Sequence, residues 1–106
     1  MAYKPVSENI FESHIEGNLP VVVDFYADWN PAAKLLEKEL FIVKAQVGER
    51  AAIVRMNIEE NPFYKDKYDI SAIPTMMIFH HGEIVWRKNG ITTAHEILEQ
   101  LNFHLV

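Results

Sequence analysis

The stretch that decides the fold reads Trp29-Asn30-Pro31-Ala32-Ala33-Lys34, and it joins the apolar run Val21–Tyr26 to a long helical pattern. An apolar run without alternation is typical of a central strand that is covered on both faces. Asn30 is a preferred N-cap residue, and Pro31 suits the first helical position, where its missing N–H is no loss. The sequence therefore predicts a strand that leads directly into a helix, with the first helical amides at a sheet edge, where α/β proteins place their chemistry.

Length, composition and charge restrict the class of protein. The 106 residues suffice for one domain, and a hydrophobic content of 49% with a charged content of 24% is ordinary for a globular protein. The formal net charge of −5 argues against nucleic acid as a partner, because phosphates require a basic face. No apolar run approaches the roughly 18 residues of a membrane span. The N-terminus lacks the apolar core of a secretion signal, so we expect a cytoplasmic protein with no membrane partner.

The residues with ligand or catalytic chemistry form no recognisable arrangement. The chain has no cysteine, which excludes disulfides, thiolate–zinc sites and thiol chemistry. His80 and His81 are adjacent, and adjacent side chains in a strand point to opposite faces, so we do not expect them to share a metal. The other histidines have no histidine partner at i, i+4 spacing: His14, His95 and His104. Solvated faces are expected for four glutamates: Glu37, Glu39, Glu59 and Glu60. The sequence thus predicts surface histidines, no metal site and no cofactor.

The remaining patterns predict an alternation of strands and helices. In chain order we expect an extended edge segment at Tyr3–Val6, a helix capped by Ser7 and ending at Gly17-Asn18, the strand Val21–Tyr26, a helix from about Pro31 to Val47, a strand Ala51–Ile58, a short helix Pro62–Tyr68, a hairpin of Thr75–His80 with Glu83–Lys88, and a final helix capped by Thr92 or Thr93. The predicted core stripe of the long helix is Leu35, Leu36, Leu40, Val43 and Val47. Crossover helices would join parallel strands, and the last two strands would pair antiparallel.

A set of short segments carries a family resemblance. These segments are Val22–Trp29 followed by Lys34, Arg55–Pro62, Lys67–Ile70, Ile73–Thr75, and Phe79 with Gly82-Glu83. In their order and spacing they resemble the thioredoxin family over nearly the whole chain. The resemblance implies one thioredoxin-like domain over residues 1–106, an α/β fold with a central, mostly parallel sheet, an antiparallel C-terminal hairpin and helices on both faces. The family's active-site motif is Trp-Cys-Gly-Pro-Cys-Lys, and in this register Asn30 and Ala33 occupy the two cysteine positions.

The resemblance also assigns expected roles to residues around that motif. Asp24 matches a buried aspartate that assists proton transfer at the second cysteine, and Arg55 stands where the family has a lysine. Burial of Asp24 would raise its pKa. Pro74 matches a proline that follows a cis peptide bond, and the backbone beside it pairs with an extended substrate peptide in the family. A partner-binding groove is therefore expected from six residues: Trp29, Ile73, Pro74, Thr75, Gly90 and Ile91.

Two hypotheses about function follow. Thiol–disulfide exchange needs an attacking thiolate, which neither Asn30 nor Ala33 can supply. The first hypothesis is a redox-inactive, monomeric module that binds a protein or an extended peptide at the groove, as an adaptor, scaffold or chaperone-like protein. The alternative is a cysteine-replaced variant of a genuine dithiol–disulfide oxidoreductase, whose parent motif would be Trp-Cys-Pro-Ala-Cys. A buried Asp24 with no thiol to serve favours the alternative. Asn30 favours the first hypothesis, because cysteine knockouts are normally made with Ser or Ala.

Overall fold

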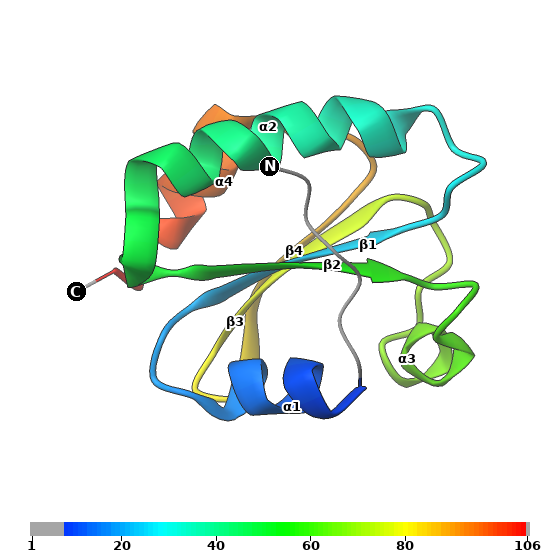
Figure 1. Ribbon diagram of the computed structural model, residues 1–106, viewed down its shortest axis with the longest axis horizontal. Helices are drawn as coiled ribbons and strands as arrows, with labels where there is room; N and C mark the ends of the chain where they lie inside the picture. The colour runs from blue at the N-terminus through cyan, green and yellow to red at the C-terminus, as the bar shows by residue number, and fades with distance from the viewer. Residues whose placement is uncertain (1–7, 106) are drawn as a thin grey trace.

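The computed structural model describes the backbone of residues 8–105 and the side chains of residues 11–105. Its elements are α1 (Glu8–Glu16), β1 (Val21–Tyr26), α2 (Ala32–Val47), the 3₁₀ turn η1 (Gly48–Arg50), β2 (Ala52–Asn57), α3 (Pro62–Lys67), β3 (Thr75–His80), β4 (Glu83–Asn89) and α4 (Ala94–Leu101). The sheet forms the middle layer, with α2 and α4 on one face and α1 and α3 on the other (Figure 1). The predicted edge segment Tyr3–Val6 and the Ser7 cap lie outside the described residues.

The described sheet is mixed, with the strand order β2-β1-β3-β4. β1 runs parallel to β2, whereas β3 is antiparallel to both β1 and β4. The expectation of a mostly parallel sheet is therefore wrong for residues 8–105, although the antiparallel hairpin is as predicted. The reason lies in the connection: α3 lies near the end of β2 (Figure 1), and the chain enters β3 from that same end of the sheet, on the other side of β1, so that β3 runs opposite to β1.

Alternating side chains of the strands build one hydrophobic core on each face of the sheet. Val21, Val23 and Phe25 of β1 pack with Phe11 of α1 and Tyr64 of α3. Val22, which points the other way, packs with residues of α2 and α4, among them Leu36, Leu40, Ile97 and Leu101. All six residues of β1 are buried, as the apolar run predicts for a central strand.

One residue of the predicted core stripe on α2 is misplaced. The stripe consists of Ala32, Ala33, Leu36, Leu40, Val43 and Val47. Leu35 is instead 52% exposed. From Ala33 onward the buried residues of α2 follow one another at spacings of three or four. Leu35 lies about 100° around the helix from Leu36, and this angle places its side chain outside the buried stripe.

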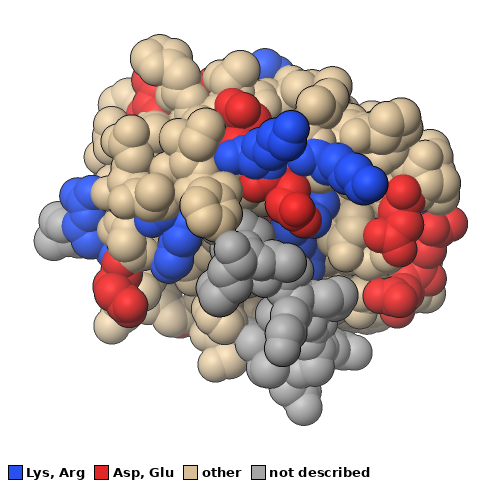
Figure 2. All heavy atoms as spheres, turned by 45° about the horizontal axis from the view of Figure 1, so that its top comes forward, with Lys and Arg blue, Asp and Glu red and all other residues tan. Residues whose placement is uncertain are grey.

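Charges of both signs are mixed on the face of the molecule that Figure 2 shows. On the face in Figure 2, lysine and arginine side chains stand in small groups beside aspartates and glutamates, without a continuous basic stripe. Within residues 8–105, no helix combines the length and the apolar character that a membrane crossing requires.

Candidate functional site

Asn30 joins the start of α2 to the loop before β3. Its Oδ1 accepts a hydrogen bond from the Ala32 amide at 2.9 Å, and its Nδ2 donates to the Ile73 carbonyl, also at 2.9 Å. Its own carbonyl accepts from the Ala33 amide at 3.0 Å. The predicted capping role of Asn30 is therefore present, although regular helix begins at Ala32, one residue later than expected. Both ends of the Asn30 amide are used, one on the helix and one on the loop.

The loop that Asn30 contacts contains the expected cis peptide bond between Ile73 and Pro74. The Pro74 carbonyl accepts from the Gly90 amide at 2.7 Å, so this loop is also tied to the end of β4. Pro74 and Thr75 are buried. The Thr75 hydroxyl donates to the Ala72 carbonyl at 2.7 Å. Of the expected groove residues, Pro74 and Thr75 therefore shape the loop from inside rather than offering side chains to a partner.

The exposed part of the expected groove is formed by large apolar side chains. Trp29 is 66% exposed and Ile91 is 54% exposed, while Ile73 is half-buried. A cavity of about 320 Å³ opens beside Trp29 and Ile73. Its other lining residues are Ile58, Glu59, Lys65, Ile70 and Ser71. The structure thus brings Trp29 and Ile73 together at an open cavity of mixed apolar and polar lining next to the start of α2.

Asp24 and Arg55 lie side by side beneath this helix start, in register on β1 and β2. The Arg55 Nε donates to Asp24 Oδ2 at 2.9 Å, and its Nη2 donates to the Ala33 carbonyl at 3.1 Å. Asp24 Oδ1 is buried and makes no hydrogen bond to the described residues. Burial raises the pKa of Asp24 to about 6, against the opposing effect of the nearby Arg55 charge. The expected proximity of Asp24, Arg55 and the position of Ala33 is confirmed.

Two of the four glutamates expected on solvated faces have structural partners instead. Glu37 accepts from Arg55 Nη1 at 3.1 Å, which extends the buried ion pair to the surface. Glu39 accepts from the Ala94 amide at 2.7 Å, so a side chain of α2 satisfies the first turn of α4. Glu59 and Glu60 are exposed, as expected. Sequence reasoning missed these contacts because each partner lies on another element.

The histidines are arranged differently from the prediction. His81 has φ 53° and lies in the turn after β3 rather than in a strand, and its ring stacks on that of His80 with centroids 4.0 Å apart. The expectation that the two rings point to opposite faces is therefore wrong. His80 Nδ1 also lies 3.2 Å from Nδ1 of His104, which follows α4. Burial, then His81 and His104, lower the pKa of His80 below its ordinary value. Among the described residues, no cluster of three or more His, Asp or Glu side chains is arranged to hold a metal.

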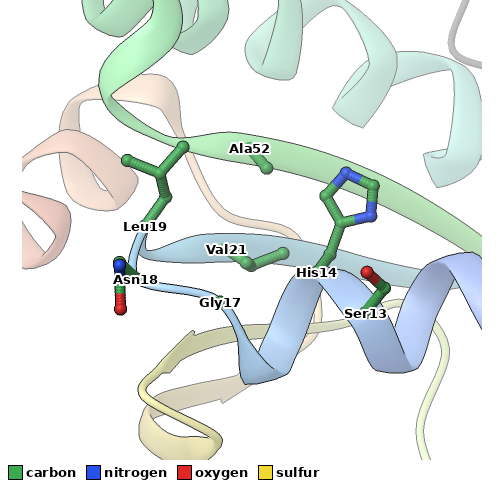
Figure 3. Close-up of a pocket in the computed structure, with 7 residues that line it drawn as sticks. All are labelled: Ser13, His14, Gly17, Asn18, Leu19, Val21 and Ala52. Atoms are coloured by element: carbon green, nitrogen blue, oxygen red, sulfur yellow. The ribbon is translucent and has the colours of Figure 1, made fainter.

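A second, smaller cavity of about 220 Å³ lies at the other end of β1 (Figure 3). The His14 ring projects from α1 toward Ala52 of β2, and Val21 and Leu19 close the cavity from the strand and its preceding loop. Val21 begins β1 whereas Asn30 follows its end, so this cavity is separate from the groove at Trp29. Apart from His14, its lining residues have no ionisable side chain, and they form no recognisable arrangement of catalytic groups.

The two positions that correspond to the family's cysteines carry no group for thiol chemistry. At the helix start, the two positions that the family gives to cysteines hold an asparagine with both amide ends hydrogen-bonded and a buried alanine. The nearby Asp24 has a pKa raised to about 6 by burial, and the sequence offers no cysteine thiol with which it could exchange a proton. What remains is a surface: an exposed tryptophan, a cavity and the backbone of the loop before β3.

Comparison with known proteins agrees with this architecture. A family model described as Thioredoxin matches residues 2–102. The thioredoxin of Rickettsia prowazekii is 33% identical over 98 residues, which are 92% of this chain and 93% of that protein. The thioredoxin of Staphylococcus epidermidis is 31% identical over 105 residues, which are 99% of this chain and 100% of that protein. A solved mutant thioredoxin from Halobacterium salinarum NRC-1 superposes with a TM-score of 0.87 at 22% identity, covering 98% of this chain and 90% of that chain. The thioredoxin fold is confirmed, and this chain belongs to the thioredoxin family.

Proposed function

We propose that this protein is a redox-inactive, thioredoxin-like module that binds an extended protein segment in the groove beside Trp29 and Pro74. Its role would be that of an adaptor, scaffold or chaperone-like protein. The observation that carries the proposal is the state of the helix start, where both ends of the Asn30 side-chain amide are hydrogen-bonded beside an open cavity. The site has a surface for binding and no group for thiol chemistry.

The backbone of the loop before β3 supports a strand-like mode of binding. Within the described part of the chain, the Ile73 N–H has no hydrogen-bond partner, while the Ile73 carbonyl is occupied by Asn30. An extended segment could accept from this N–H and place apolar side chains against Trp29 and Ile91. Trp29 suits this role, because exposed tryptophans that become buried on binding commonly dominate interface energetics.

Displayed random peptides provide the test, followed by affinity measurements on the selected sequences. We expect selection of apolar, extended peptides, and Trp29→Ala should weaken their binding at least about tenfold. Phe103→Ala is the matched control, because Phe103 is an aromatic residue with 77% exposure that lies beyond α4. Its affinity should stay within about twofold of the unchanged protein. Peptides that bind equally well to the Trp29→Ala variant would place the interface elsewhere, and a failed selection would argue against peptide binding altogether.

The second candidate remains a cysteine-replaced variant of a genuine oxidoreductase. The observation that favours it is Asp24, which is fully buried with one oxygen unpaired and a pKa near 6, next to the helix position where a second cysteine would stand. Such a carboxylate has an obvious use in proton transfer to or from a thiol and no visible use here. Restoring both cysteines distinguishes the two candidates.

A further inference from the structure

The end of β3 holds an arrangement that the proposed function does not use. His80 is the last residue of β3, and His104 lies in the segment that follows α4. Their two Nδ1 atoms are 3.2 Å apart, and both side chains are half-buried. Residues 24 positions apart in sequence thus bring the same ring nitrogen of two imidazoles within hydrogen-bonding distance.

This separation is the one that a shared metal ion requires. Two imidazole nitrogens that each bind a tetrahedral zinc ion at about 2.0–2.1 Å stand roughly 3.3–3.4 Å from one another. The observed 3.2 Å also permits a hydrogen bond between one protonated and one unprotonated nitrogen. A metal ion would therefore compete with this shared proton for the two ring nitrogens, as metal ions generally compete with protons for their ligands.

The backbone at both histidines is held in place before any ion binds. His80 belongs to the ladder between β3 and β4, where it pairs with Glu83. The His104 amide donates to the Leu101 carbonyl at 2.9 Å, and Leu105 packs against the core between α2, α4 and the sheet. Little conformational entropy remains to be lost at these positions on binding, which favours a pair of ligands over two independent histidines.

We propose that His80 and His104 form a binding site for one divalent transition-metal ion of the zinc class. Imidazole nitrogen is a good ligand for Zn²⁺, Ni²⁺ and Cu²⁺ and a poor one for Mg²⁺ and Ca²⁺, which prefer oxygen. Water completes the coordination, since no third His, Asp or Glu side chain among the described residues is arranged to join such a site. The bound ion would link the β3–β4 hairpin to the segment after α4, far along β3 from the groove.

Calorimetric titration of the full chain without a histidine tag tests the site, with ZnCl₂ as the probe and neutral, non-chelating buffer. We expect saturable binding of one zinc ion per chain, and none with MgCl₂. His104→Gln should lower the zinc affinity at least about tenfold, because it removes one of two ligands. His95→Gln is the matched control: it also removes one imidazole, but from an 89% exposed position on α4. Its zinc affinity should stay within about twofold of the unchanged protein.

A second variant and a second measurement separate ligand loss from misfolding. His80→Gln should weaken zinc binding as His104→Gln does, and far-UV spectra should show both variants folded. Zinc should also shift the imidazole NMR signals of His80 and His104 while leaving that of His95 in place. Absence of saturable binding up to about 1 mM zinc would overturn the proposal. Unchanged affinity in either folded glutamine variant would overturn it as well.

Discussion

The two ends of β3 differ in what their polar groups are free to do. At the start of the strand, the Ile73 carbonyl, the Pro74 carbonyl and the Thr75 hydroxyl all have partners within the chain. At the end, the His80 ring lies against those of His81 and His104, and which Nδ1 donates between His80 and His104 depends on the tautomers of the two rings. One strand therefore begins at a site with fixed hydrogen bonds and ends at a site with adjustable ones.

This difference shows that the fold alone does not determine where reactive or titratable side chains lie. In this family the sheet edge at the start of α2 is the expected place for reactivity, and here it is occupied by groups that stabilise the local structure. The titratable cluster lies instead at an end of the sheet to which the family resemblance assigns nothing. A fold positions side chains, and the residues at each position decide what they do.

The largest effect on activity is expected from the double substitution Asn30→Cys and Ala33→Cys, which would place both thiols of the family motif at the start of α2. The unchanged protein should not raise the rate of insulin disulfide reduction above that of the reductant alone, because it has no thiol. In the double variant, the thiolate at position 30 would face the Ala32 amide, which now donates to Asn30 Oδ1. Its pKa should fall below the usual value of about 8.5. We expect a reversible intramolecular disulfide and measurable insulin reduction.

The single variant Ala33→Cys is the control, since it has a thiol but no partner with which to close a disulfide. If the double variant also accepts electrons from a thioredoxin reductase, the groove is still that of an oxidoreductase and the cysteine-replaced history is favoured. If the disulfide forms but engages neither insulin nor reductase, the groove has specialised for another partner. If no disulfide forms on mild oxidation, the register of positions 30 and 33 is wrong.

The next largest effect concerns the buried carboxylate below the helix start. The pKa of Asp24 is raised from 3.8 to about 6 in the folded protein. Folding therefore disfavours the ionised form of Asp24. Its carboxyl contributes most to the free energy of unfolding below about pH 4, where it is protonated in both states. This contribution declines as pH rises to about 6. At about 1.36 kcal/mol per pKa unit, the loss amounts to about 3 kcal/mol and then stays constant at higher pH. Asp24→Asn removes this titration. Between about pH 4 and pH 6, the free energy of unfolding of the variant should therefore rise by about 3 kcal/mol relative to that of the unchanged protein.

Denaturant unfolding of both proteins at a series of pH values measures this gain. The difference between the two proteins over the pH interval is the quantity to follow, because a constant offset arises when Arg55 exchanges a carboxylate for an amide partner. Glu37→Gln serves as a control, since Glu37 contacts the same guanidinium from a side chain that is 46% exposed. A difference that does not change with pH would mean that Arg55 compensates the Asp24 charge completely.

The parts that sequence predicted are those fixed by neighbours along the chain. The apolar run of β1, the Asn30–Pro31 helix start and the Thr93 cap of α4 depend on local patterns, and all three are present in the structure. The juxtaposition of Asp24 and Arg55 and the cis bond before Pro74 came from the family register, and both are present as well.

The parts that sequence did not predict depend on contacts between elements. The His80–His104 contact spans 24 residues and has no helical or strand periodicity to reveal it. Glu39 reaches the start of α4 across 55 residues. The direction of β3 depends on the end of the sheet at which the connection through α3 returns, and the apolar pattern of a strand does not determine its direction. The second hydrogen bond of Asn30, to Ile73, belongs to the same class: the cap was predictable and the contact with the loop was not.

The smallest of the three effects, and the one that most directly sharpens the comparison between the ends of β3, is the loss of Asn30 itself. Asn30→Ala removes both the cap on Ala32 and the bond to Ile73, and in a half-buried place this should lower the free energy of unfolding by about 1–2 kcal/mol. Thr93→Ala is the matched control, because Thr93 caps α4 through a single bond to the Glu96 amide at 3.1 Å and makes no loop contact. Asn30→Asp separates the two bonds of Asn30: a carboxylate can still accept from the Ala32 amide and favours a helix N-terminus, but it has no hydrogen to donate to the Ile73 carbonyl. We therefore expect the unchanged protein to be the most stable, Asn30→Asp to be intermediate and Asn30→Ala to be the least stable. Amide hydrogen exchange around Ile73 should be faster in both variants. If Asn30→Asp is as stable as the unchanged protein and exchange near Ile73 is unaltered, the bond to the loop contributes nothing, and Asn30 is a helix cap and no more.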